Sequence, residues 1–279
     1  MIDPDLIFHY TGLAGLQGII EDQKIFATDI RFLNDPGEST FGMQRLRTPI
    51  DRFVERCASP SAELTEFQTR MNSMIWEETL FATCFCKDGN LLSQWRGYAR
   101  QGYALGFSRS AVEHLVRVIL YDLIYNEDEQ AEIVNRVLQE KFGHLGSGVL
   151  RSADAVGNQR DYILQRDDIL RSAAIEMLQL LPRLKHHSFE EEQESRAVQW
   201  YDVEPRDGNV RFRDTALGPT PYVSTNIGDR HGTSALRRIV IGPTPHRKAA
   251  KIGVDLLLKV NDLEGRVEVM NSPTPFRWQ

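Results

Sequence analysis

The stretch Thr79-Leu-Phe-Ala-Thr-Cys-Phe-Cys86 is a continuous apolar run that ends at the turn residues Lys87-Asp88-Gly89-Asn90. A short apolar run with β-branched and aromatic residues, bounded by turn residues, is typical of a buried strand. Cys84 and Cys86 are two residues apart and therefore share one face of that strand. We predict a central strand here, with both cysteines as buried free thiols.

Further strand patterns lie on both sides of this run, separated by helical patterns. The predicted strands are Leu6–Tyr10, Lys24–Asp29, Gly102–Ser108, Glu194–Tyr201, Ile239–Ile241 and Val267–Met270. The predicted helices begin near Leu13, near Thr40 (interrupted at Pro60), at Leu91 and at Ser110, the last reaching Leu181 with a break near Gly143. Two stretches, Pro205–Pro221 and Ser224–Thr233, are predicted loops. This order of elements predicts an α+β fold around a mixed or antiparallel sheet, as one domain over residues 1–279 with 110–185 as a helical insertion.

Composition excludes several classes of protein. The 279 residues are 41% hydrophobic and 26% charged, with a net charge of −6, which disfavours a generic polyanion binder. No apolar run approaches the roughly 18 residues that a membrane span needs, and the start lacks a basic, then apolar, leader. Three cysteines cannot form a disulfide framework. We therefore expect a cytoplasmic protein that does not bind membranes.

The common catalytic signatures are missing from the sequence. There is no G-x-x-x-x-G-K-[ST] loop, no H-E-x-x-H and no G-x-S-x-G. His186 and His187 are adjacent, so on a helix they would point about 100° apart, which disfavours a chelating pair. We expect no metal.

Polar and aromatic residues instead cluster at the ends of the predicted strands. They are His9-Tyr10-Thr11, Asn34-Asp35-Pro36, Ser93-Gln94-Trp95-Arg96-Gly97-Tyr98 and Glu192-Gln193-Glu194-Ser195-Arg196. Together they indicate a pocket for a ribose-bearing dinucleotide. A neutral imidazole at His9 can donate to a ribose hydroxyl while its other nitrogen accepts. The alternative is a structural histidine that bonds a nearby carbonyl.

The segment after the central strand offers ring and phosphate contacts. Ser93 and Arg96, and likewise Trp95 and Tyr98, are three residues apart and share a helical face. Trp95 suits the core, whereas Tyr98 could stack on a planar ring such as nicotinamide. Arg96 is a candidate for a pyrophosphate contact, because a guanidinium binds phosphate oxygens bidentately.

Two carboxylates, Glu192 and Glu194, point to the same side if they lie on a strand. Carboxylates that face one cleft repel each other, and the pKa of one of them can rise. Such a pair suits a reaction whose transition state is a cationic sugar. Arg196, on the same face, could instead neutralise one carboxylate, and a solvated acidic run is a further alternative.

Several short motifs carry a resemblance that extends from Phe8 to Arg277. They are HYTGLAGLQGII from residue 9, FLNDPGE from residue 32, SQWRGYA from residue 93, FEEEQESR from residue 189, IVIGP from residue 239 and the closing segment 272–277. In these motifs the chain resembles a bacterial family described as a domain of unknown function. That family in turn distantly resembles the ADP-ribosyltransferases of toxin and anti-phage type.

The second resemblance implies a split mixed sheet, NAD as substrate and a His, Tyr, Glu triad. It implies that His9, supported by Thr11, contacts the adenosine ribose and that Tyr98 stacks on nicotinamide. It also implies that Glu194 bonds the nicotinamide ribose and stabilises the oxocarbenium ion, while Glu192 orients or deprotonates the acceptor. The full set of candidate NAD-binding residues is His9, Tyr10, Thr11, Asn34, Asp35, Ser93, Trp95, Arg96 and Tyr98.

The stretch Tyr201–Lys251 is locally basic, with nine Lys and Arg against five Asp and Glu. Loops of this kind with Phe212 and Tyr222 could hold single-stranded nucleic acid through phosphate contacts and stacking, although scattered charge on solvated loops is an equal alternative. The candidate acceptor-binding residues are Arg211, Arg213, Arg237 and Arg238. The expected function is a defence toxin that transfers ADP-ribose to RNA or single-stranded DNA, restrained by an antitoxin or other inhibitory protein. The alternatives are a protein target, water as acceptor (an NAD glycohydrolase) and a non-catalytic nucleotide-binding module.

Overall fold

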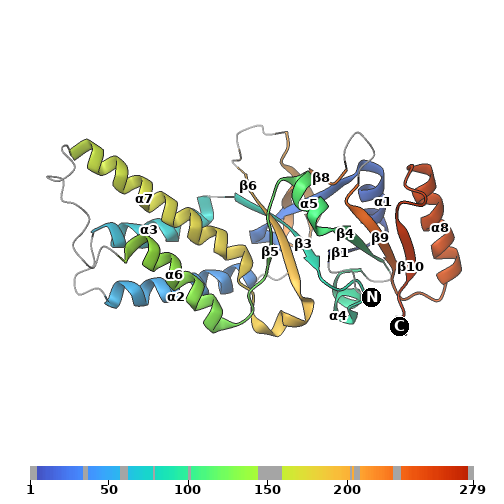
Figure 1. Cartoon of the computed structure of the whole chain (residues 1–279), viewed down its shortest axis with the longest axis horizontal. Coiled ribbons are helices and arrows are strands. Elements are labelled where there is room, and N and C mark those ends of the chain that lie inside the picture. Colours follow the sequence, from blue (N-terminus) through green and yellow to red (C-terminus); the bar gives the residue numbers. More distant parts are fainter. Residues whose placement is uncertain are drawn as a thin grey trace.

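The computed structural model describes residues 5–33, 37–56, 62–77, 79–99, 102–143, 159–201, 203, 208–228 and 234–275. Within these residues ten strands form one sheet in the middle and at one end of an elongated molecule (Figure 1). The strands are β1 (Leu6–Thr11), β2 (Lys24–Asp29), β3 (Thr79–Cys86), β4 (Tyr103–Ser108), β5 (Leu120–Asp122), β6 (Glu194–Tyr201), β7 (Arg211–Thr215), β8 (Gly218–Asn226), β9 (Leu236–Ile241) and β10 (Glu268–Asn271). Their order is β10-β9-β4-β1-β3-β2-β8-β7, with β6 also paired to β3 and β5 paired to β6. The sheet is mixed, because β9 and β10 are parallel while the other pairs are antiparallel.

The central strand β3 has an incomplete edge. β6 pairs along its whole length. On the other edge β2 pairs only at Phe81 and Ala82, and β1 pairs only at Cys86. Residues 83–85 therefore have no strand partner on that edge, and the sheet is split there between β1 and β2.

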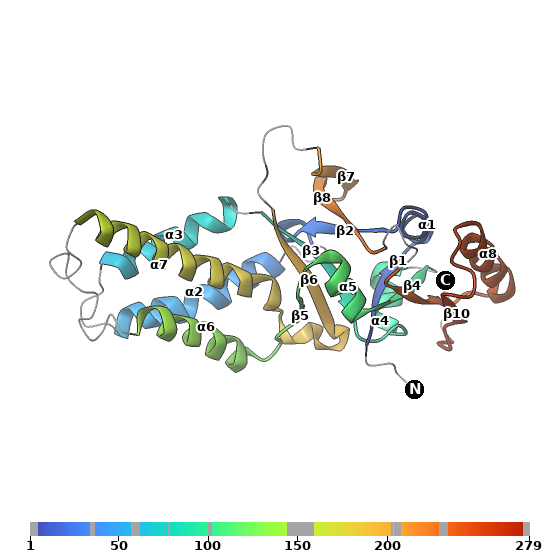
Figure 2. The ribbon, with the colours of Figure 1, turned by 45° about the horizontal axis from the view of Figure 1, so that its top comes forward.

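Eight α-helices and several one-turn helices accompany the described strands. They are α1 (Leu13–Asp22), α2 (Glu38–Arg56), α3 (Ala62–Glu77), α4 (Leu92–Gln94), α5 (Arg109–Val116), α6 (Glu127–Phe142), α7 (Gln159–Leu180) and α8 (Arg247–Val260), with η1 (Ile30–Phe32), the π-helix η2 (Trp95–Ala99), η5 (Leu181–Arg183) and η6 (His187–Glu192). Helices α2, α3, α6 and α7 lie side by side as a bundle at one end of the molecule (Figure 2). Helix α8 lies at the opposite end, next to β9 and β10.

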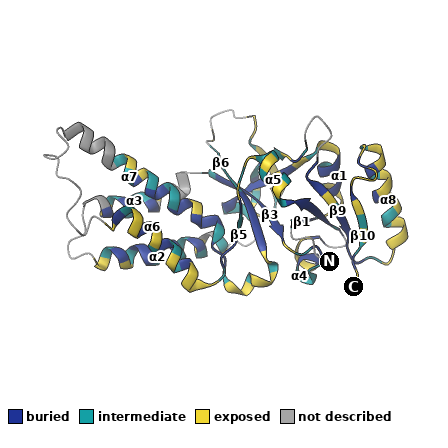
Figure 3. Ribbon diagram, viewed as in Figure 1, coloured by how far each residue is buried: buried dark blue, intermediate teal, exposed yellow. Residues whose placement is uncertain are grey.

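The sequence of β3 explains how the two halves of the molecule are joined. Leu80 and Ala82 face the bundle and pack in one core with residues such as Phe67 and Met177. Phe85 points to the other face and packs in a second core with helix α1 and helix α8. Burying a side chain of this size contributes about 1.5–3 kcal/mol. Figure 3 shows the buried residues along the inner sides of the bundle and through the sheet.

The α+β fold agrees with the sequence prediction, and β2, β3 and β6 have the predicted bounds. Two predictions are wrong. The stretch 110–185 is not wholly helical, because it contains β5, which pairs with β6; three residues are too short to show a strand period. The predicted loops 205–221 and 224–233 contain the hairpin β7–β8. β8 contains Pro219 and Pro221, and proline is uncommon within sheets.

The described helices include none that is long and apolar enough to cross a membrane. Cys84 and Cys86 are free thiols, as predicted, although Cys84 is only partly buried. The predicted helix break at Pro60 lies outside the described residues, whereas helix α6 ends at Phe142 with Gly143 as its C-cap, where a second break was predicted.

Candidate functional site

A cavity of about 530 Å³ opens at the split in the sheet. His9 of β1, Phe26 of β2 and Cys84 of β3 line it. Glu192 and Glu194 also line it. This volume lies in the range of small-molecule sites.

Side-chain hydrogen bonds replace the missing strand pairing in the split. His9 Nδ1 lies 2.9 Å from the carbonyl oxygen of Cys84, and Thr83 Oγ1 donates to the carbonyl of Phe26 at 3.1 Å. A carbonyl oxygen can only accept, so Nδ1 of His9 carries the proton and Nε2 is left as an acceptor. Burial lowers the pKa of His9, and the nearby charge of Arg213 lowers it further, which keeps the imidazole neutral. The carbonyl bond that we considered as the structural alternative is therefore present, and a ribose hydroxyl would have to donate to Nε2.

The two carboxylates are joined by one lysine. Lys185 Nζ lies 2.6 Å from Glu192 Oε2 and 2.6 Å from Glu194 Oε2. Arg196 Nε donates to Glu194 Oε1 at 2.6 Å, and its Nη2 donates to Glu194 Oε2 at 3.1 Å. Both oxygens of Glu194 are thus occupied, whereas Glu192 accepts from Lys185 through one oxygen only.

A third carboxylate joins this charge cluster. Glu38, the first residue of α2, forms an ion pair with Arg196 Nη2 and also lines the cavity. With Glu38, Glu192 and Glu194 ionised, three negative charges face two positive charges, from Lys185 and Arg196. The charge cluster then has a net charge of −1.

The two glutamates differ in acidity. Burial raises the pKa of Glu194, but Arg196 and Lys185 outweigh it, so that this pKa lies well below its usual range. Burial also raises the pKa of Glu192, and here the pairing with Lys185 does not fully compensate. Glu194 is therefore held in its ionised form, while Glu192 binds a proton more readily than an unperturbed glutamate does.

Glu192 and Glu194 do not lie on one strand, which was the condition for their alignment. Glu192 ends η6, Gln193 has a left-handed φ of 44°, and Glu194 begins β6. The alternation of a strand therefore does not align the carboxylates, although Lys185 brings them together. Gln130 of α6 holds the backbone of this lysine, because its Nε2 donates to the carbonyl oxygen of Lys185 at 2.9 Å.

The SQWRGYA segment divides between core and cavity. Tyr98 lines the cavity with 42% of its surface exposed. Trp95 is fully buried and its Nε1 donates to Asn90 Oδ1 at 3.2 Å, as its assignment to the core predicts. Ser93 and Arg96 do not line the cavity; Ser93 Oγ instead donates to Glu191 at 3.3 Å.

The other candidate NAD-binding residues have different positions. Thr11 lines the cavity. Tyr10 also lines it, but its hydroxyl is turned away and donates to the carbonyl of Asp88 at 2.9 Å. Asn34 and Asp35 lie outside the described residues.

The four candidate acceptor-binding arginines are not gathered in one place. Arg211 and Arg213 lie on β7 rather than on a loop, and only Arg213 lines the cavity. Arg237 and Arg238 lie on β9, on the far side of β4 and β1 from the cavity's β2 wall. Arg238 Nε is paired with Glu268 at 2.7 Å. The four arginines fall within one basic interval of the sequence, but the strand order of the sheet places the two pairs apart.

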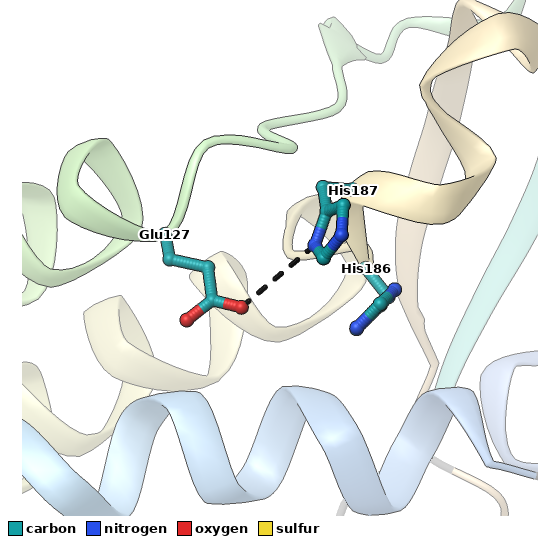
Figure 4. A group of neighbouring side chains, drawn as sticks. All are labelled: Glu127, His186 and His187. Carbon is teal, nitrogen blue, oxygen red and sulfur yellow. Dashed lines mark ion pairs between the residues drawn. The ribbon is translucent and has the colours of Figure 1, made fainter.

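A second group of side chains outside the cavity has the composition of a metal site (Figure 4). Ligand atoms of Glu127, His186 and His187 lie within 4.8 Å of one another. However, His186 Nδ1 already accepts from the backbone N–H of Ser188 at 3.2 Å, so a metal at Nε2 would require that bond to break. Arg45 also donates to Glu127 at 2.8 Å and puts a cation beside the carboxylate. The group fits hydrogen bonding better than metal binding.

Several residues of the cavity were not singled out from the sequence. Lys185 and Lys24 sit in segments without any catalytic pattern. Glu38 ended the FLNDPGE motif and could have been found there. Phe26 was visible only as an apolar residue of a predicted strand.

A comparison with protein families adds one finding. A family described as "Protein of unknown function (DUF2971)" matches residues 94–197. This match supports the resemblance to a family of unknown function over a stretch that contains Tyr98, Glu192 and Glu194 but not His9. No curated protein and no solved structure matches the chain.

Proposed function

We propose that this protein is an NAD-dependent ADP-ribosyltransferase that acts in the cavity at the split sheet. One observation carries the proposal: His9, Tyr98 and the charge cluster, which come from distant parts of the chain, line the same cavity. A neutral imidazole acceptor suits a ribose hydroxyl, an exposed tyrosine ring suits nicotinamide, and a cluster with net charge −1 suits a developing cation.

The reaction needs few groups. The bond between C1′ of the nicotinamide ribose and the ring nitrogen breaks, and its electron pair leaves with nicotinamide, which becomes neutral. C1′ becomes an oxocarbenium centre, to which an oxygen or nitrogen of the acceptor bonds while it loses a proton. Glu192 takes that proton, because its pKa is raised and one of its oxygens is not tied to Lys185.

Glu194 has a different role in this scheme. Its carboxylate stays ionised and holds Lys185 and Arg196 in place. In this arrangement Glu194 stabilises the oxocarbenium ion as part of a charge cluster rather than as an isolated carboxylate. The scheme thereby assigns the proton transfer to Glu192 and the fixed charge to Glu194.

The biological setting follows from the resemblance and is part of the proposal. The protein acts as a defence toxin in the cytoplasm, on a nucleic acid acceptor, and an antitoxin or other inhibitory protein restrains it. Neighbouring genes give an inexpensive check, because an adjacent small reading frame of antitoxin type would support this setting.

Incubation of the purified protein with NAD labelled in the adenosine part tests the activity. Separate reactions contain RNA, single-stranded DNA, a protein fraction or buffer alone. We expect label on a polynucleotide and free nicotinamide in equal amount. Label on the protein fraction would show that the acceptor is a protein. Free ADP-ribose in buffer alone would show that the protein is an NAD glycohydrolase. Saturable NAD binding without release of nicotinamide would make it a non-catalytic nucleotide-binding module.

Glu192→Gln and Glu191→Gln form a matched pair for this assay. Glu191 is the exposed neighbour and does not line the cavity. We expect Glu192→Gln to reduce nicotinamide release and Glu191→Gln to leave it unchanged. Equal rates for the two variants would overturn the role given to Glu192.

A further inference from the structure

The hairpin β7–β8 and strand β2 present one face that combines rings and cations. Thr28 of β2 pairs with Tyr222 of β8, and Tyr222 pairs with Arg211 of β7. Residues that are directly opposite, or two apart on one strand, share a face of the sheet. Phe26 and Lys24 of β2 and Arg213 of β7 therefore lie on the same face as Tyr222 and Arg211. We call these five residues the aromatic–basic face.

The rings on this face are paired and accessible. The ring centroids of Phe26 and Tyr222 lie 4.3 Å apart, and 43% of the surface of Phe26 is exposed. An exposed phenylalanine beside a second ring on an otherwise polar surface offers a platform on which a planar group can stack. Phe212 lies on the opposite face of the hairpin and is 65% exposed, so it provides a natural comparison.

The cations on this face are not neutralised. Within the part of the chain that the structure describes, no ion pair joins Lys24, Arg211 or Arg213 to a carboxylate. Arg213 donates instead to Thr28 Oγ1 at 2.9 Å. The one acidic residue of β7, Asp214, alternates onto the opposite face. Three positive charges therefore surround two rings, in a chain whose net charge is −6.

This face continues into the cavity. Lys24, Phe26 and Arg213 belong to its lining as well as to the aromatic–basic face. The residues of the charge cluster belong to the same lining. A chain molecule held on the aromatic–basic face would thus reach the carboxylates without leaving the protein surface.

We propose that the aromatic–basic face binds single-stranded nucleic acid and delivers it to the cavity. A base stacks on Phe26 and Tyr222, and Lys24, Arg211 and Arg213 contact flanking phosphates. Single strands fit because their bases are free to stack, whereas a duplex hides its base faces. An acidic peptide would use the cations but leave the rings without a partner. The delivery step rests on the proposed function, whereas the binding step does not.

Binding is measured without NAD, by fluorescence anisotropy of a labelled 12-nucleotide RNA or DNA strand over a salt series. The variants are Phe26→Ala, its matched control Phe212→Ala, and Phe26→Tyr, which keeps the ring. Since base stacking contributes about 1–3 kcal/mol per base, we expect Phe26→Ala to weaken binding by about 5- to 150-fold. Phe212→Ala and Phe26→Tyr should bind like the wild type, and circular dichroism melts should show that all variants are folded.

The cations have their own readout. Arg211→Gln should lower the slope of log affinity against log salt by about 0.7, the value for one phosphate contact on a single strand. Lys248→Gln on the distant helix α8 should leave the slope unchanged.

Three results would overturn the proposal: equal loss in Phe26→Ala and Phe212→Ala, equal affinity for a duplex of the same length, or equal competition by poly-glutamate. Turnover separates the two hypotheses. Strand binding that depends on Phe26 without nicotinamide release keeps this inference and removes the proposed activity. Nicotinamide release without strand binding does the reverse.

Discussion

His9 Nδ1 lies 2.9 Å from the carbonyl oxygen of Cys84, at the point where β3 has no strand partner on that edge. A side chain of β1 thus occupies the position of a backbone donor from a neighbouring strand. The bond satisfies a carbonyl that would otherwise be left without a donor, and it fixes the tautomer that turns Nε2 into an acceptor. The gap in the sheet and the chemistry of the histidine have the same origin.

The lowered pKa of His9 predicts a stability that depends on pH. Because the pKa is lower in the folded state, the unfolded chain takes up a proton first as pH falls. The contribution of the neutral histidine is complete above the unfolded-state pKa of about 6.5 and is lost as pH falls toward the folded-state pKa. His9→Asn keeps a donor for the Cys84 carbonyl but cannot titrate. We expect the difference in unfolding free energy between wild type and His9→Asn, from urea titrations, to shift against the wild type between pH 7 and pH 5. A difference independent of pH would contradict this assignment.

Replacement of Arg196 should lower the unfolding free energy more than replacement of a surface cation does. Arg196 is buried and pairs with both Glu194 and Glu38, so its loss leaves buried carboxylates without compensation. Breaking a buried pair of this kind costs about 3–5 kcal/mol. We expect that loss for Arg196→Met in urea titration. The control Arg238→Met removes a partly exposed pair with Glu268 and should cost about 0–1 kcal/mol.

Two glycines in one short segment should respond in opposite ways to alanine. A Cβ at Gly102 would overlap the backbone carbonyl oxygens of Thr11 and Ala99, which cannot move without shifting β1. A Cβ at Gly97 would meet no atom within 4 Å. We expect Gly102→Ala to lower the melting temperature by several degrees and Gly97→Ala to change it little, as measured by differential scanning calorimetry. Similar melting temperatures for both variants would show that β1 accommodates the extra carbon.

Substitutions at Glu192 and Glu194 should differ in their effects on turnover and on stability. Glu194→Gln removes the charge between Lys185 and Arg196, so both stability and nicotinamide release should fall. Glu192→Gln should leave the urea midpoint nearly unchanged while nicotinamide release falls by about 10²-fold or more, as for loss of a proton acceptor. A stable but inactive Glu194→Gln together with an active Glu192→Gln would exchange the two roles.

The sequence predicted those parts of the molecule that local patterns determine. The bounds of β3 and β6 follow from apolar runs and turn residues, and the burial of Trp95 follows from its position in a short helix. β5 was missed because three residues show no period, and β8 because prolines hid its alternation. Lys185 could not be found, because its role depends on Gln130 and on a left-handed residue between two glutamates. Such relations arise from tertiary contacts and have no spacing signature.

Two residues of the bundle contact or join the charge cluster, although the cluster otherwise belongs to β6 and the turns before it. Glu38 opens α2, and Gln130 of α6 grips the backbone of Lys185, which follows α7 and η5. The position of the bundle therefore affects the distribution of charge in the cavity. A tilt of its helices against β3 would move Glu38 away from Arg196 and Lys185 away from Glu194. A molecule that binds the outer surface of these helices and tilts them would therefore change the electrostatic potential in the cavity without entering it.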